Sequence, residues 1–241
     1  MERPGAPGAP GLQLDMGSNP KIPARNASQK RLYRSRDERS RQILDAALEL
    51  FAEHGFATTL QAIADRVGIT QPLVHRYFPT KSKLLEAVRE ELLQGHWRAE
   101  WRDMLSDRAR PLAQRLAEFY EDYLTVIFQR VWYRGFLHIA VQDALFAQFY
   151  LSRITSDVLG TVLAETRHEL ALPGPSEVAV HERELELAWG MHSALVFIGF
   201  RMFIYDIAPP RDFAGVVRDQ TSGYILTAER VMTELHRPGN G

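Results

Sequence analysis

The stretch between residues 58 and 78 constrains the fold most, because three signals that end or begin helices fall within it. Gly68 follows an apolar pattern of helical spacing and is expected to end a short helix, since glycine readily adopts the left-handed conformation there. Pro72 is tolerated only in the first turn of the next helix, and Pro79 interrupts that helix. The pattern predicts two short helices joined by a tight turn.

A longer helix is predicted before this stretch. Residues 37–53 carry apolar side chains at helical spacing, and Gly55 ends the run as a C-terminal glycine does. Thr58 followed by Gln61 is typical of a capping box that opens the first short helix, with Thr59 as the alternative cap. Three helices therefore follow one another closely.

A short helix, a turn around glycine and a second short helix form a helix-turn-helix, whose second helix enters the major groove of DNA. That second helix is predicted over residues 71–78, and a fourth helix begins at Lys81. Ala64 is small enough to let the paired helices approach. The expected shared core is Ile63, Val67, Ile69, Val74 and Phe78. The expected exposed face, suited to base edges, thymine methyls and phosphates, is Gln71, Leu73, His75, Arg76 and Tyr77.

Any DNA binding must come from a local basic surface. The 241 residues include 29 Lys and Arg against 30 Asp and Glu, a formal net charge of −1, so the chain lacks a general positive excess. Residues 1–36 are rich in Gly, Pro and Ala and then basic, which predicts a disordered arm. Two interpretations of the arm stay open: contacts to phosphates or the minor groove, or a solvated tail without function.

The rest of the chain is predicted to be helical. Apolar residues recur at helical spacing and no strand alternation is seen. The predicted helices cover residues 97–105, 111–130, 132–141, 144–170, 177–205 and 211–236. The predicted fold class is therefore all-α. It comprises the arm 1–36, a helix-turn-helix DNA-binding domain over 37–82, and a larger helical ligand-binding and dimerisation domain over 83–241.

The N-terminal domain resembles that of the TetR (tetracycline-repressor-like) family. Many positions match in order and spacing over about a fifth to a quarter of the chain. The matching positions are the run from Arg41 to Phe51, Gly55-Phe56, Thr59, Ile63-Ala64, Gly68-Ile69-Thr70, Tyr77-Phe78, Lys81 and Leu84-Leu85. The remainder is similar to the family only in being helical and of the right length.

The resemblance implies roles for individual residues. It implies phosphate contacts by Thr59, Tyr77 and Lys81 and a base contact by Gln61. Gln71 and Pro72 match the opening of the recognition helix, while His75 stands where the family usually has a tyrosine that contacts the DNA backbone. The full set of predicted DNA-binding residues is Thr59, Gln61, Gln71, Pro72, Leu73, His75, Arg76, Tyr77 and Lys81.

Some of these roles have simpler alternatives. Thr59 can serve only as a helix cap, His75 can face solvent without touching DNA, and Lys81 can be a solvated surface lysine. Leu73 can belong to the core, although its place beside Pro72 favours a contact to a thymine methyl.

The last two predicted helices are candidates for dimerisation. Both carry small residues that allow close backbone approach: Gly190, Ala194 and Gly199 in one, and Gly215, Ser222, Gly223 and Ala228 in the other. The residues alone favour an intramolecular core, whereas the resemblance implies a four-helix interface between two subunits. A symmetric dimer would place two recognition helices about 34–36 Å apart, in successive major grooves of a palindrome.

Aromatic residues concentrate in the larger domain, where a cavity between helices is a usual ligand site. Such a stripe also fits an ordinary core. Polar residues on mostly apolar helices are the sharper candidates, because a buried polar group needs a partner. The predicted ligand-binding residues are Trp132, Phe136, His138, Gln142, Phe149, Trp189, His192, Phe197 and Arg201.

Catalytic and membrane functions find no support in the sequence. Glu165 and His168 have the Glu-x-x-His spacing of a di-iron helical bundle, but a second such motif is lacking. The chain has no cysteine, no His-Glu-x-x-His and no phosphate-binding glycine loop. No cofactor or metal is expected. No apolar run approaches the roughly 20 residues of a membrane span, so a cytoplasmic protein without membrane contact is expected.

These features together predict a homodimeric transcriptional repressor. It would bind a palindromic DNA operator and be released by a small apolar or aromatic effector, acting through its different affinity for two conformations. Two alternatives stay open: a transcriptional activator, and a TetR-like helical adaptor without sequence-specific DNA binding. Gln71, Tyr77 and Lys81 speak against the adaptor, whereas the substitution at His75 leaves it open.

Overall fold

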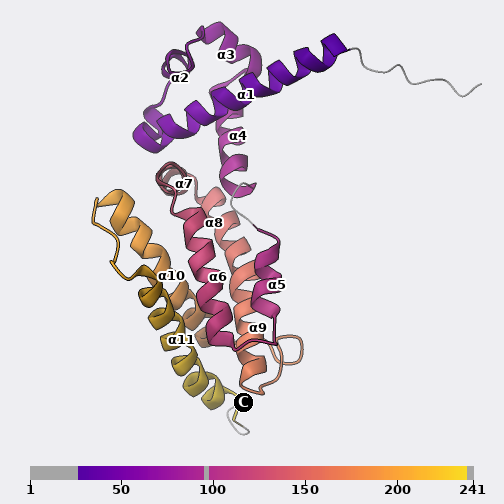
Figure 1. Cartoon of the computed structure of the whole chain (residues 1–241), viewed down its shortest axis with the longest axis vertical. Helices are drawn as coiled ribbons and strands as arrows, with labels where there is room; N and C mark the ends of the chain where they lie inside the picture. The colour runs from indigo at the N-terminus through magenta and orange to yellow at the C-terminus, as the bar shows by residue number, and fades with distance from the viewer. Residues whose placement is uncertain (1–26, 95–97, 238–241) are drawn as a thin grey trace, which may run out of the picture. The chain divides into compact units, whose positions relative to one another are not determined.

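The computed structural model describes residues 27–94 and 98–237, and these residues form helices and no strand, which confirms the all-α prediction (Figure 1). The chain divides into two compact units, residues 1–38 and 39–241. Most of the predicted arm, residues 1–26, lies outside the described residues.

The helix-turn-helix region follows the predicted order. It comprises α1 (Ala27–His54), a short 3-10 turn (Gly55–Ala57), α2 (Leu60–Val67), α3 (Gln71–Tyr77) and α4 (Lys81–Gln94). The first helix begins ten residues earlier than the predicted start at Asp37. The added segment contains three Arg and one each of Lys, Gln, Leu and Ala, which favour helix without any apolar period.

The helix ends match the glycine signals, while one cap differs from its prediction. Gly55 and Gly68 have φ of +56° and +72°, the left-handed conformation that ends α1 and α2. The hydroxyl of Thr59, not Thr58, caps α2 by accepting from the amide of Ala62 at 3.1 Å. Thr58 is buried instead and donates to the carbonyl of Leu50 at 2.9 Å. The alternative cap is thus the right one.

The core of this region joins α1 to the two short helices. Ile63, Ala64 and Val74 are almost completely buried. Val67 and Ile69 are half-buried and pack against the same core. Because α3 is only seven residues long, packing rather than intrinsic helix stability must hold it in place.

The larger part of the chain contains longer helices: α5 (Glu100–Ser106), α6 (Leu112–Ile127), α7 (Arg130–Gln142), α8 (Ala144–Arg153), α9 (Gly160–Glu169), α10 (Glu182–Ile204) and α11 (Phe213–Leu235). The predicted single helix over 144–170 is interrupted by a π-helical segment, Ile154–Leu159, between α8 and α9. The predicted helix from 177 starts five residues later, at Glu182, because His181 and Glu184 form a capping box there.

Helix α10 corrects the expectation about apolar runs. It is long and apolar enough to cross a membrane by length and composition, and a third of its most apolar window is buried. It packs against α11, α7 and α9, as the core helix of a bundle does. Part of its apolar surface nevertheless remains uncovered by the described residues of the chain.

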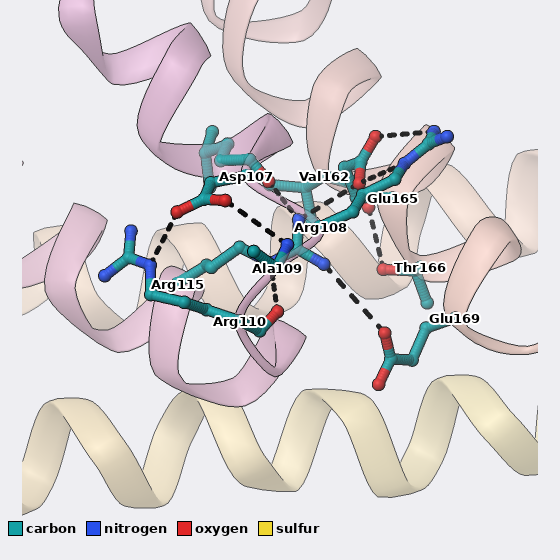
Figure 2. A network of polar contacts seen from close by, with 10 residues as sticks. Asp107, Arg108, Ala109, Arg110, Arg115, Val162, Glu165, Thr166 and Glu169 are labelled. Carbon is teal, nitrogen blue, oxygen red and sulfur yellow. Dashed lines mark hydrogen bonds and ion pairs between the residues drawn. The ribbon is translucent and has the colours of Figure 1, made fainter.

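A buried ionic cluster joins α5, α6 and α9 (Figure 2). The carboxylate of Glu165 on α9 forms ion pairs with Arg115 of α6 and with Arg108 of the connecting loop, each at 3.0 Å. Burial alone would raise the pKa of Glu165, but hydrogen bonds from Arg108 and Arg115 lower it on balance. The carboxylate of the Glu-x-x-His pair is therefore occupied by guanidinium groups, and the described residues hold no cluster of metal-ligating side chains.

Candidate nucleic-acid interface and ligand cavity

The recognition helix α3 presents a mixed polar face. Val74 is fully buried and anchors the helix, while Pro72 in its first turn, His75 and Arg76 are exposed. Gln71, Leu73 and Tyr77 are half-buried. Tyr77 packs against the core with its apolar ring, so only part of that side chain remains for DNA. The five residues of the predicted face thus lie on one short helix, with different exposures.

The imidazole of His75 turns back toward its own helix end. Its Nδ1 lies 3.1 Å from the carbonyl oxygen of Pro79. Because a carbonyl can only accept, Nδ1 must carry the proton, and in the neutral ring Nε2 is then an acceptor. A neutral His75 therefore offers no hydrogen-bond donor at Nε2 to a phosphate, unlike the tyrosine that is usual at this position in the family that the sequence resembles.

Helix α2 supplies two more predicted residues. Thr59 is exposed and caps the helix, so its hydroxyl is already oriented at the helix N-terminus. The amide of Gln61 donates to Asp65 at 2.7 Å. Arg66 on the same helix is bound to Glu49 at 2.7 Å and to Glu53 at 3.4 Å. The ion pairs hold α2 to α1 and leave this arginine less available for phosphates.

Lys81 lies at the start of α4 and is half-buried. Its amine donates to the carbonyl of Phe56 at 2.7 Å, which ties α4 to the turn that precedes α2. The hydroxyl of Thr80 caps α4 by accepting from the amide of Lys83 at 3.1 Å. An ammonium group has three donors, so Lys81 retains capacity for a phosphate beside this structural bond.

A cavity of about 230 Å³ lies between α6, α7, α8 and α10. It contains five of the predicted ligand-binding residues: Trp132, Phe136, Trp189, His192 and Phe197. The prediction missed nine further lining residues: Tyr123, Ile127, Tyr133, Leu137, Tyr150, Leu151, Ser193, Val196 and Phe200. Aromatic content pointed to the region, but which side of each helix faces the cavity depends on how the helices pack.

The cavity is aromatic and uncharged. Trp132 stacks on Phe136 with ring centroids 5.4 Å apart, and the hydroxyls of Tyr123 and Tyr150 are 3.2 Å apart. Burial lowers the pKa of His192 to about 4 and raises that of Tyr150 to about 12, so both are neutral near pH 7. Among the described residues that line the cavity, none is Asp, Glu, Lys or Arg.

Four predicted ligand-binding residues lie outside this cavity. His138 and Gln142 line a separate shallow pocket on α7, where the His138 ring lies against Gly55. Phe149 is 53% exposed because its neighbour Tyr150 takes the inward position on α8. Arg201 lies past the cavity on α10, and its buried Nε has no hydrogen-bond partner among the described residues.

Helix α7 connects the cavity to the helix-turn-helix region. Trp132 lines the cavity with its ring, while its indole N–H donates to the carbonyl of Leu92, near the end of α4, at 3.0 Å. Arg134 donates to the carbonyls of Ala52 in α1 and Phe203 in α10, both at 3.0 Å. These bonds span 40 to 82 residues of sequence, so no local pattern could have revealed them.

The partly exposed helix α3, braced by α1 and α2, is typical of a helix-turn-helix protein. The larger helical part of the chain contains a cavity of the kind that accepts a small ligand. The family model of the bacterial regulatory proteins of the TetR family matches residues 43–88. Residues 43–88 of this chain are therefore of the TetR type.

Curated relatives align with only part of the chain. The regulator BetI of Paraburkholderia phymatum is 35% identical over 80 residues, which cover 33% of this chain and 41% of that protein. The transcriptional activator FasR of Mycolicibacterium smegmatis is 43% identical over 62 residues, 25% of this chain and 26% of that one. The alignment therefore spans less than half of the length of these relatives.

Solved structures extend the similarity in fold to most of the chain. A TetR-like transcriptional regulator from Rhodococcus sp. RHA1 has 19% identity and a TM-score of 0.53, covering 80% of this chain and 96% of that one. A TetR-family regulator from Streptomyces coelicolor has 18% identity and a TM-score of 0.54, covering 85% and 92%. The fold of both parts is thus one found in TetR-family regulators.

Proposed function

We propose that this protein is a DNA-binding transcriptional regulator that acts as a homodimer on a palindromic operator. The carrying observation is α3, which is anchored by buried Val74 and exposes Pro72, His75 and Arg76 on a TetR-family scaffold. The relatives BetI and FasR support this assignment, since the first is named as an HTH-type transcriptional regulator and the second as an HTH-type transcriptional activator.

The proposed domain division keeps a helix-turn-helix domain near residues 37–82 and a larger domain over 83–241. In the larger domain, the uncharged aromatic cavity favours a neutral apolar or aromatic effector of small size. The effector would shift the spacing of the two DNA-binding domains through its different affinity for the two conformations. Relatives that act as regulators rather than enzymes, together with the absence of a catalytic motif in the sequence, favour a cytoplasmic binding protein.

The dimer is proposed to form through α10 and α11. Gly190 on α10 and Gly223 on α11 both open to free space, where a Cβ would meet nothing within 4 Å. Ala194 and Ser222 are exposed beside them. Not all of the small residues fit this role. Gly199 packs against Phe128, where a Cβ would lie only 2.6 Å away, Gly215 lies against Asp212, and Ala228 is buried within the chain.

The decisive experiment is DNA binding as a function of salt. Fluorescence anisotropy with a fragment from the region upstream of the protein's own gene should show dimer binding that weakens by about a hundredfold between about 50 and 200 mM salt, if some four phosphates are neutralised. Binding that is insensitive to salt, or absent from all fragments of that region, would favour the adaptor instead.

A promoter reporter distinguishes a repressor from an activator. If the protein is a repressor, reporter output should fall when the protein is supplied and should recover when the effector is added. A rise would make the protein an activator, as the relative FasR is named.

A further inference from the structure

The exposed side of α10 has a self-complementary order. Six exposed or half-buried residues form a stripe along the helix: Glu186, Gly190, Ser193, Ala194, Phe197 and Arg201. They are spaced three and four apart around a centre, so they lie on one face. The acidic Glu186 lies at one end of the stripe and the basic Arg201 at the other, while the small residues Ser193 and Ala194 lie in the middle.

This order matches itself under a twofold axis. If two copies of α10 pack antiparallel with the axis between Ser193 and Ala194, each residue meets the one equally far on the other side. Glu186 then lies opposite Arg201 of the partner subunit, and Phe197 opposite Gly190 of the partner subunit. Charge is paired with opposite charge, and the largest side chain with the residue that has no side chain.

Two observations within the chain favour a second copy as the occupant of this surface. Only 33% of the most apolar window of α10 is buried within the chain. Phe197 on this helix remains 51% exposed, although it stacks on Phe200 with centroids 5.4 Å apart. A large half-exposed aromatic ring on a partly covered apolar helix marks a surface that is completed by a partner.

The same stripe forms part of the ligand cavity. Ser193 and Phe197 line the cavity and are exposed as well, and Leu151, at 44% exposure, lies on its lining from α8. The cavity therefore opens onto the face that carries the stripe. Phe197 thus belongs to the cavity wall and also remains 51% exposed.

We propose that a second copy of this chain closes the ligand cavity, with Phe197 shared between the cavity wall and the contact over Gly190 of the partner subunit. The inference rests on the proposed function for the existence of a dimer and an effector. It adds the register of the contact and a physical link: a ligand that displaces Phe197 also disturbs the dimer. Dimer formation and ligand affinity then depend on each other by the same factor.

Charge reversal tests the register. Glu186→Arg and Arg201→Glu each place like charges opposite one another, so each variant alone should dissociate more readily than wild type in sedimentation velocity. An equimolar mixture should form a heterodimer, because both contacts then pair Arg with Glu. Glu100→Arg, which reverses an exposed glutamate of α5, outside the two helices of the proposed interface, is the matched control and should dimerise as wild type. Recovery in the mixture also shows that both variants fold.

Singles that dimerise like wild type, or a mixture that forms no heterodimer, would overturn this register. The measurement requires no DNA. If the wild-type protein does not bind an operator, the proposed regulator is refuted, but the proposed register of the dimer is not affected. If no heterodimer forms, the register is refuted, but the result for DNA binding is not affected.

Ligand binding tests the closed cavity. The probe is N-phenyl-1-naphthylamine, a neutral aromatic molecule whose fluorescence rises in apolar surroundings. The wild-type dimer and the restored heterodimer should bind it with affinities that differ from that of monomeric Glu186→Arg by about fivefold or more. Equal affinity in monomer and dimer, or no probe binding by wild type, would contradict closure by a second copy.

Discussion

Lys81 and Gln71 have different surroundings, although the resemblance to the TetR family assigns both to DNA. Gln71 is half-buried in the first turn of α3, where an amide can reach base edges. Lys81 is held by the carbonyl of Phe56, so it supports the fold as well as the local positive charge. The type of a residue therefore indicates which contacts its side chain can make with DNA. The hydrogen bonds that the side chain makes within the protein decide which of its donors and acceptors remain for those contacts.

Replacing these residues should separate reading from positioning. Gln71→Ala should relax preference at particular base pairs by about 1–3 kcal/mol, whereas Lys81→Ala should weaken binding to all sequences and lower the salt slope by about one. Anisotropy with operator variants measures both. Lys83→Ala, on an exposed lysine paired with Glu86, is the control. Uniform loss in both variants would show that the division of roles is wrong.

His192 should make stability depend on pH. Burial lowers its pKa to about 4 from an ordinary 6.5, so between these values the unfolded chain binds a proton that the folded chain does not. Stability should therefore fall as the pH drops from 6.5 toward 4, by up to about 3 kcal/mol. Above pH 6.5 this contribution is complete.

Chemical denaturation of His192→Gln at several pH values checks this prediction. The free energy of unfolding of the variant should decline less than that of wild type between pH 7 and 4.5. His168→Gln, on an exposed histidine of α9, should follow wild type. Parallel curves for wild type and His192→Gln would contradict the assignment.

At the scale of elements, ionic bonds join helices that are distant in sequence. Glu165 binds Arg115 across 50 residues and thereby links α9 to α6. Arg167 on α9 binds Glu184 at 2.5 Å, with both side chains fully buried, and so joins α9 to the beginning of α10. Such pairs are costly to break from one side, because the remaining charge stays buried without a partner.

Glu165→Ala should accordingly lower the free energy of unfolding by about 3 kcal/mol, since Arg115 is only 1% exposed. Urea denaturation measures the loss. Glu169→Ala is the control, because that exposed carboxylate is 3.9 Å from Arg115 and should matter by less than about 1 kcal/mol. Similar losses in both variants would show that burial of the pair is not what stabilises these helices.

At the scale of the whole molecule, α7 connects the ligand-sized cavity to α4, the helix that follows the helix-turn-helix. Trp132 of α7 contacts both the cavity and α4, with its ring in the cavity wall and its N–H on the carbonyl of Leu92. A ligand that moves this ring must strain or break that bond, which gives the proposed effector a physical route to α4.

Trp132→Phe should therefore keep an aromatic side chain in the cavity wall but lose the N–H bond to Leu92 and with it the coupling. Binding of N-phenyl-1-naphthylamine should change little, whereas the effect of the probe on operator affinity should shrink by about 1 kcal/mol. Trp189→Phe, which alters another indole of the cavity wall, should retain the coupling. An unchanged probe effect in Trp132→Phe would exclude this route.

The helix-turn-helix could be predicted from the sequence because its signals are local. Gly55 and Gly68 can adopt the positive φ that ends a helix, and Pro72 fixes φ in the first turn of the next one, whatever surrounds them. The positions of α2, α3 and the start of α4 followed. The apolar period likewise predicted the helical body. The choice between Thr58 and Thr59 as cap was open in the sequence, and burial of Thr58 against Leu50 decided it.

The cavity and its connections depend on tertiary structure. Aromatic content located the region, yet His138, Gln142 and Phe149 face elsewhere, because the rotation of each helix is set by packing against its neighbours. The bonds of Trp132, Arg134 and Glu165 join residues far apart in the chain. Local backbone preferences follow from the amino-acid sequence alone, whereas contacts between helices that are distant in sequence form only when these helices pack into the core.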